Sequence, residues 1–138
     1  MDTASLVGTW RLVDASFDEQ PAFGESPRGV LIYTADGHVS VAISHDGRRA
    51  LSVEDRVEAP PGERADAFAT FFAYSGRYSV SGHEVRHEVE VASVQNWVGT
   101  VLVRDVRVEG DTLVLHTPPT PVGGAIRVTR LVWKRVAP

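Results

Sequence analysis

The sequence predicts an all-β chain whose eight antiparallel strands close into an up-and-down barrel, with one short helix near residues 62–73. Short segments rich in β-branched residues alternate between apolar and polar side chains, and turn residues separate them. Each segment can pair with the next one along the chain, as in a meander. Because 138 residues is a common size for one folding unit, we expect a single domain over residues 1–138.

Turn residues set the limits of the expected strands. Asp36-Gly37 predicts a tight hairpin because glycine readily adopts a positive φ. Ser81-Gly82 and Gly110-Asp111 mark two further turns. We expect strands at residues 6–17, 29–34, 38–44, 74–80, 84–92, 99–108, 112–117 and 126–136.

Residues 45–73 interrupt the alternation. Residues 45–62 are polar and rich in Asp, Arg and Pro, which predicts a long loop. After Pro60-Pro61, residues 62–72 carry Phe68, Phe71 and Phe72 at helical spacing, which predicts a short amphipathic helix. Such a helix is either a lid on the barrel mouth or a plug that covers one end of the core.

The lengths of the terminal segments favour a closed barrel over an open two-layer sandwich. The first and last expected strands are the longest, as expected when both bend to meet each other. Closure removes two unpaired strand edges. Eight strands enclose a space that side chains fill or that holds one small ligand.

Composition and charge exclude several functional classes. The net charge is −4 and the basic residues are scattered, whereas a nucleic-acid partner requires a concentrated positive surface. The N-terminus lacks the basic and apolar regions of a secretory signal, and no apolar run is long enough for a membrane helix. We therefore expect a cytoplasmic protein with no nucleic-acid or membrane partner, and the sequence leaves a homodimer open.

The ends of the chain carry a recognisable pattern. Gly8-Thr9-Trp10 lies in the first expected strand, and Arg135 lies in the last, with Arg130 as a second candidate for the same position. Further short motifs follow in order, namely Pro27-Arg28-Gly29, Leu31-Ile32-Tyr33-Thr34, Ala73-Tyr74, Asn96-Trp97-Val98-Gly99-Thr100 and Leu131-Val132-Trp133.

These motifs resemble the bacterial and fungal lipocalin-like domain family over residues 5–136. The resemblance implies an eight-stranded calyx in which Gly8 allows close approach, Trp10 closes the base, and Arg135 packs over the indole ring. It implies no single activity, because such barrels include binders of apolar molecules and cofactor-free enzymes of natural-product pathways. The chain has no cysteine and so lacks the disulfide of secreted lipocalins.

Alternation in two strands predicts which side chains line the interior. Arg86, Glu88 and Glu90 form a solvated face, so His87, Val89 and Val91 are expected to point inward. In the next strand the set with fewer charges comprises Leu102, Arg104, Val106 and Val108, which we also expect inside.

Arg104 would then be a partly buried cation that requires an anion or a carbonyl partner. A register slipped by one residue would instead leave it on the surface. An inward His87 facing Arg104 forms a candidate acid–base or anion-binding pair, or a hydrogen-bonded core histidine.

Aromatic residues complete the expected lining. Tyr74 and Tyr78 share one face, and Gly76 between them leaves room for a ligand. Tyr33 joins them, with Leu31 as its inward neighbour, although such residues are also ordinary core. The remaining lining candidates are Asn96, which binds a ligand or the turn backbone, and Trp97, which caps the barrel end.

Other kinds of site are not predicted. His83 and His87 lie four residues apart without a third ligand at a suitable spacing, so no metal site is expected. Nucleotide, dinucleotide and serine-hydrolase motifs are absent from the sequence, so no cofactor is expected.

Two functions follow from this interior. The first is a barrel that binds a small, largely apolar molecule with a polar or anionic end, anchored by Arg104, His87 and a tyrosine. The second is a cofactor-independent cyclase, isomerase or dehydratase, in which His87 or a tyrosine such as Tyr78 moves a proton and Arg104 stabilises an oxyanion. A barrel filled solid would instead serve as an interaction domain.

Overall fold

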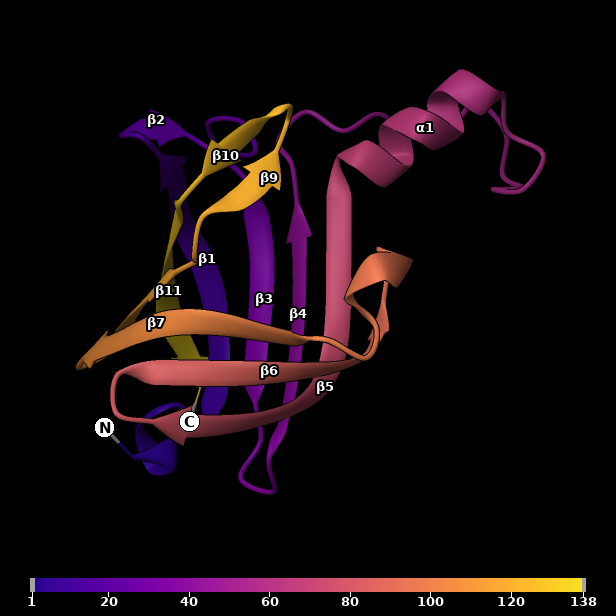
Figure 1. Ribbon diagram of the computed structural model, residues 1–138. Helices are drawn as coiled ribbons and strands as arrows, with labels where there is room; N and C mark the ends of the chain where they lie inside the picture. Colours follow the sequence, from indigo (N-terminus) through magenta and orange to yellow (C-terminus); the bar gives the residue numbers. More distant parts are fainter. Residues whose placement is uncertain (1, 138) are drawn as a thin grey trace.

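The first and last barrel strands pair with each other and close the sheet. The computed structural model describes residues 2–137, and among these nine strands form one sheet. Strand β1 (Gly8–Phe17) pairs with both β3 (Arg28–Tyr33) and β11 (Thr129–Ala137), while the two-residue β2 (Gln20–Pro21) only extends β1. The other eight strands form the closed antiparallel barrel that the sequence predicted (Figure 1).

The strands follow one another around the barrel in chain order, which confirms the predicted meander. At the hairpin before β4, Gly37 adopts a φ of +93°, the conformation for which glycine was expected there. The remaining barrel strands are β4 (His38–Ser44), β5 (Phe71–Ser81), β6 (Glu84–Ala92), β7 (Val101–Glu109) and β8 (Thr112–His116).

Strand β5 is the longest of the described strands. From the sequence, the first and last barrel strands were expected to be the longest, and this expectation is wrong, because β1 and β11 are both shorter than β5. Strand β5 runs down the barrel and then bends beneath β6 (Figure 1). The register between β5 and β6 shifts between Ser75 and Gly76. A Cβ atom at Gly76 would collide with the carbonyl oxygen of Glu88, so this glycine permits close approach of two backbones and does not serve to make room for a ligand.

The register shift corrects one expected lining residue. Val91 pairs with Ser75, whose side chain lies on the outer face, where its hydroxyl lies 2.8 Å from that of Ser40. Val91 is therefore 62% exposed and does not point inward. A bulge inserts one extra residue and so reverses the alternation, which the sequence pattern did not reveal.

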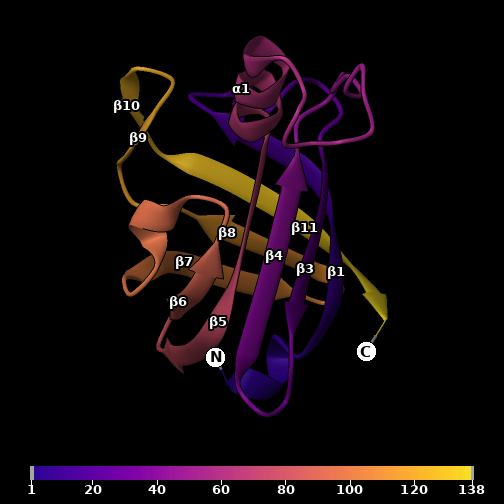
Figure 2. The same ribbon diagram turned by 90° about the vertical axis from the view of Figure 1, so that its right-hand side faces the viewer.

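The helix is shorter than predicted and covers no core. Helix α1 (Pro61–Ala69) ends where the Thr70 amide bonds the Asp66 carbonyl, and Phe71 begins β5 because residues 71–73 pair with β4. None of its residues is buried, and Phe68 is 60% exposed. The helix projects from the upper end of the barrel (Figures 1 and 2), so it neither closes that end as a lid nor fills it as a plug.

The last predicted strand is two elements. Gly123 and Gly124 both adopt positive φ and connect β9 (Thr120–Val122) to β10 (Ala125–Arg127) as a small separate hairpin. Strand β11 begins only at Thr129, so residue 126 does not belong to it. The 3-10 turns η1 (Thr3–Ser5) and η2 (Gln95–Trp97) complete the described elements.

Arg135 closes the base of the barrel over Trp10, as expected. Its guanidinium carbon lies 4.1 Å from the centroid of the Trp10 ring. Its Nη1 and Nη2 donate to the carbonyls of Val7 and Ser5 at 2.8 and 3.0 Å. The alternative, Arg130, is exposed and lies 3.8 Å from Asp14 on the outside. Arg135 therefore joins the last strand to the N-terminal segment.

The barrel interior is mainly aliphatic and aromatic. Its core joins inward residues from all eight barrel strands, with Leu31 and Trp10 fully buried. Among the described residues, no helix is long and apolar enough to cross a membrane.

Replacing Arg135 with Ala should lower the free energy of unfolding by about 2–3 kcal/mol, because the variant loses the cation–π contact and two charged hydrogen bonds. Chemical denaturation measures this change. Arg130→Ala on the same strand is the control and should change stability by less than about 0.5 kcal/mol. Equal effects of the two variants would contradict the role assigned to Arg135.

Candidate functional site in the barrel interior

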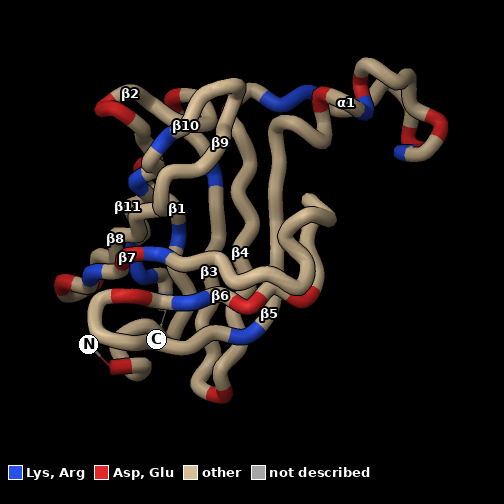
Figure 3. The backbone as a smooth tube through the Cα atoms, in the orientation of Figure 1, with Lys and Arg blue, Asp and Glu red and all other residues tan. Residues whose placement is uncertain are grey.

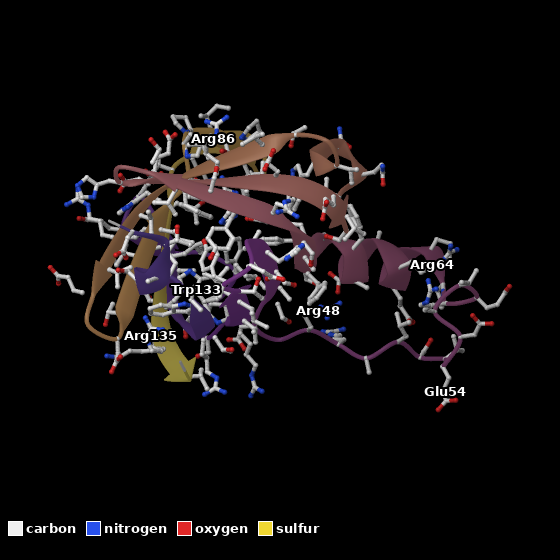
Figure 4. All side chains as sticks on the ribbon, turned by 90° about the horizontal axis from the view of Figure 1, so that it is seen from below. Arg48, Glu54, Arg64, Arg86, Trp133 and Arg135 are labelled. Atoms are coloured by element: carbon white, nitrogen blue, oxygen red, sulfur yellow. The ribbon has the colours of Figure 1, made fainter. Side chains whose placement is uncertain are left out.

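Alternate side chains of β6 face the interior. His87 is 1% exposed and Val89 is buried, whereas the alternate residues Arg86, Glu88 and Glu90 are exposed. In Figure 4, Arg86 lies outside the ring of strands, on the opposite side of the sheet from the interior. The alternation predicted for His87 and Val89 is confirmed.

Strand β7 has the register that places Arg104 inside. Val106 is fully buried, and Leu102 and Arg104 are half-buried, while Asp105 and Arg107 are exposed. Antiparallel pairing sets Leu102 opposite His87 and Arg104 opposite Val85. The structure thus brings the charged end of Arg104 to the same interior face as His87.

A histidine between two tyrosines is the main polar feature of the interior. Tyr33 Oη lies 2.7 Å from His87 Nε2, and Tyr74 Oη lies 2.7 Å from His87 Nδ1. The three residues come from β3, β5 and β6, and all three are buried. Both ring nitrogens of His87 are therefore engaged by phenols, an arrangement we call the Tyr–His–Tyr cluster.

Burial keeps the cluster uncharged. Removal from water and, to a smaller extent, the positive charge of Arg104 lower the pKa of His87 to about 3. Burial also raises the pKa of Tyr33 and of Tyr74 above that of a free phenol. At neutral pH the cluster therefore consists of a neutral imidazole and two neutral phenols.

Arg104 is a cation beside this cluster without a carboxylate partner. Its Nη1 donates to the Val103 carbonyl at 3.1 Å, and its positive charge lowers the pKa of Tyr74 and of His87, which places it close to the cluster. Among the described residues, no Asp or Glu is buried, and none forms an ion pair with Arg104. A half-buried guanidinium of this kind attracts an anion or a carbonyl oxygen.

Tyr78 belongs to the same aromatic group but bonds elsewhere. Its ring packs edge-to-face on Tyr33 with centroids 4.7 Å apart. Its hydroxyl donates to the Thr34 carbonyl at 2.7 Å, beside the hairpin that precedes β4. The structure therefore brings Tyr78 close to Tyr33 without a bond to His87, and its expected role in proton transfer stays a prediction.

Aromatic rings continue from the cluster to the edge of the barrel. Trp97 in η2 packs edge-to-face on Tyr74 and on Phe72, with centroid separations of 5.9 and 5.7 Å. Phe72 in turn contacts Phe23 at 5.6 Å. Trp97 is half-buried, as expected for a residue that caps the barrel end, whereas Asn96 beside it is exposed.

Trp133 on β11 is the interior residue that sequence reasoning missed. Its indole lies within the ring of strands in Figure 4, and its Nε1 is buried without a hydrogen-bond partner. The sequence did contain a signal for it. Because Arg135 was expected over Trp10, alternation along the same strand places Trp133 and Leu131 on the inward face as well.

Most expected lining residues lie in the interior. Leu31, Tyr33, Tyr74, Val89 and Val106 are buried, and Leu102 is half-buried. Whether they contact a ligand stays a prediction. Among the described residues, no group of three His, Cys, Asp or Glu side chains is arranged to hold a metal ion.

Comparison with known proteins supports the resemblance seen in the motifs. The model of the lipocalin-like domain family matches residues 7–136. The chain belongs to this family. The Trp10 and Arg135 pair that joins the two ends of this lipocalin-like domain thus lies within the matched region.

The chain is similar to a curated protein and to a solved structure. The 4'-hydroxy-3'-methoxypropiophenone carrier protein ppsC of Aspergillus oryzae is 36% identical over 101 residues, which are 67% of this chain and 86% of that protein. The crystal structure of the wild-type fluorescent protein UnaG is similar with a TM-score of 0.44 and 13% identity, over 97% of this chain and 99% of that one.

His87 should make this lipocalin-like domain sensitive to acid. Unfolding raises the pKa of His87 from about 3 to near 6.5, so below that upper value only the unfolded chain takes up a proton there. From about pH 6.5 to about pH 4.5, this one group should remove roughly 2–3 kcal/mol of the free energy of unfolding. Denaturation across this range should show a steeper loss for the unmodified protein than for His87→Gln.

The control is His83→Gln, at an exposed histidine in the turn between β5 and β6; this variant leaves the Tyr–His–Tyr cluster intact and should lose stability as steeply as the unmodified protein. In addition, the ring protons of His87 should show no titration by NMR down to about pH 4.5. Titration of His87 near pH 6.5 would contradict the neutral cluster.

Proposed function

We propose that this protein binds one small, largely apolar molecule inside the barrel and acts as a carrier. The observation that carries the proposal is the Tyr–His–Tyr cluster with Arg104 beside it, which forms a polar group in an otherwise apolar interior. Ligand sites of small molecules commonly combine an apolar wall with a few directed polar groups. The polar end of the ligand would lie against Arg104 and the cluster.

The name of the Aspergillus relative supports the same role. That relative is called a carrier, and 4'-hydroxy-3'-methoxypropiophenone combines an aromatic ring and an ethyl chain with a ketone, a phenol and a methoxy group. Such a molecule is largely apolar with polar oxygens at its periphery. We therefore propose that the ligand of this chain belongs to the same chemical class. We call 4'-hydroxy-3'-methoxypropiophenone the ketone probe.

The ionisation of the cluster favours binding over acid–base catalysis. A histidine with a pKa of about 3 is a weak base at neutral pH, and both nitrogens of His87 already bond to phenols. A neutral, fully engaged imidazole orients the two tyrosines more readily than it exchanges protons with a substrate. The cyclase or isomerase alternative therefore has less support than a carrier.

Charge over the surface agrees with a small-molecule partner. Figure 3 shows Lys and Arg interspersed with Asp and Glu over the strands, and the net charge is −4. A polyanion would need a concentrated positive surface. A cytoplasmic location, the absence of a nucleic-acid or membrane partner and a homodimer stay predictions from the sequence.

The purified protein should bind the ketone probe in a one-to-one complex by isothermal titration calorimetry. Arg104→Met should weaken binding about ten- to hundredfold, because a charge-assisted hydrogen bond contributes about 1.5–3 kcal/mol. Arg86→Met is a matched control on the neighbouring strand, since it removes an outward guanidinium, and it should bind like the unmodified protein. Lack of binding, or equal losses in both variants, would count against the proposed site.

A further inference from the structure

The unused polar hydrogens of the barrel interior reveal what the ligand must offer. Tyr33, His87 and Tyr74 together carry three polar hydrogens when neutral, but they form only two hydrogen bonds among themselves. One ring nitrogen of His87 donates to a phenol oxygen, and the other accepts from the second phenol. Whichever tautomer is present, one phenolic hydrogen therefore remains without a partner in the cluster.

Trp133 supplies a second donor. Its side chain is fully buried, and its Nε1 has no partner, whereas Nε1 of the equally buried Trp10 donates to the Leu6 carbonyl at 2.9 Å. In the pairing of β11, Trp133 lies opposite Leu12 and Leu113, which offer only apolar side chains. An unmatched buried N–H group costs about 1–3 kcal/mol, and a ligand oxygen would remove that cost.

Arg104 adds a third set of donors, and nothing inside balances them. Its guanidinium carries five N–H groups, and the hydrogen bond described for them is the one from Nη1 to the Val103 carbonyl. Among the described residues, the buried polar side chains other than tyrosine and tryptophan are His87 and Thr129, and no carboxylate is buried. The interior therefore has spare donors and no buried anionic acceptor.

We infer that the ligand is recognised through its hydrogen-bond acceptors, with one acceptor oxygen at Arg104 and the Tyr–His–Tyr cluster and a second at the Trp133 indole. This inference rests on the proposed carrier function and names the chemical class of its ligand, an apolar molecule with two separated acceptor oxygens, such as an aryl ketone that also bears an ether oxygen. Donor groups on the ligand add little to binding.

Three probes separate this inference from the carrier function itself. The first is the ketone probe itself. The second is 2-methoxy-4-propylphenol, which differs from the ketone probe only in lacking the ketone oxygen. The third is 4'-fluoro-3'-methoxypropiophenone, in which fluorine replaces the phenolic hydroxyl and so removes the hydrogen-bond donor. Loss of the ketone oxygen should weaken binding about tenfold or more, because it leaves donors unmatched. Loss of the phenol donor should change the dissociation constant by less than about threefold.

Each outcome of the titrations has a distinct meaning. If the propylphenol binds as tightly as the ketone, or if the fluorinated ketone loses more affinity than the propylphenol, the acceptor inference is wrong while the carrier function stands. If none of the three compounds binds, the carrier function proposed for this class of ligand fails with it.

The indole N–H signals test the second acceptor in the unmodified protein. The chain has three tryptophans, and Trp133→Phe assigns the signal of Trp133 in a ¹⁵N–¹H NMR spectrum. Saturation with the ketone probe should move that signal downfield, as expected for a new hydrogen bond, while the signal of the already bonded Trp10 stays in place. A Trp133 signal that is unchanged at saturation would rule out the second acceptor position.

If Trp133→Phe does not fold, Trp97→Phe and Trp10→Phe assign the other two signals, and Trp133 follows by elimination. Where Trp133→Phe folds, it should bind the ketone probe about three- to tenfold more weakly than the unmodified protein. Unchanged affinity in that variant would contradict the proposed contact.

Discussion

The pairing of β1 with β11 is the constraint on which the rest of the structure depends. Once the first and last strands share backbone hydrogen bonds, the sheet has no free edge, and every strand has one face turned to a common interior. Arg135 strengthens this junction because it stacks on Trp10 and bonds two carbonyls of the N-terminal segment. Which face each residue takes, and hence the composition of the interior, follows from closure.

Closure also explains why the polar residues inside are neutral and bonded to one another. A charge removed from water is costly unless a partner compensates it, so a buried imidazole loses its proton and a buried phenol keeps its own. His87 meets this requirement with two phenols, at 2.7 Å on each side. Arg104 is only half-buried, and its guanidinium remains available to a ligand.

The helix outside the barrel is held by polar contacts and not by burial of apolar side chains. Helix α1 has no buried residue, and polar contacts hold it to the preceding loop, such as those of Arg48 with Thr70 and the Ala67 carbonyl. The amphipathic pattern around Phe68 predicted a buried face, but the ladder between β4 and β5 takes residues 71–73 into the sheet. Backbone pairing with β4, a strand distant in sequence, therefore determined the conformation of residues 71–73, although their spacing had predicted a helix.

The sequence by itself determined the features that depend on local alternation and turn chemistry. Period-2 patterning predicted the meander of eight strands and the inward positions of His87 and Arg104. The place of Arg135 over Trp10 was instead implied by the resemblance to the lipocalin-like family. Only the tertiary structure decided which phenols meet His87, since Tyr33 lies 54 residues away. It also decided that a bulge turns Val91 outward and that the Trp133 indole has no partner. The reason is that alternation is set within one strand, whereas contacts across the barrel depend on the register between strands, and one extra residue reverses it.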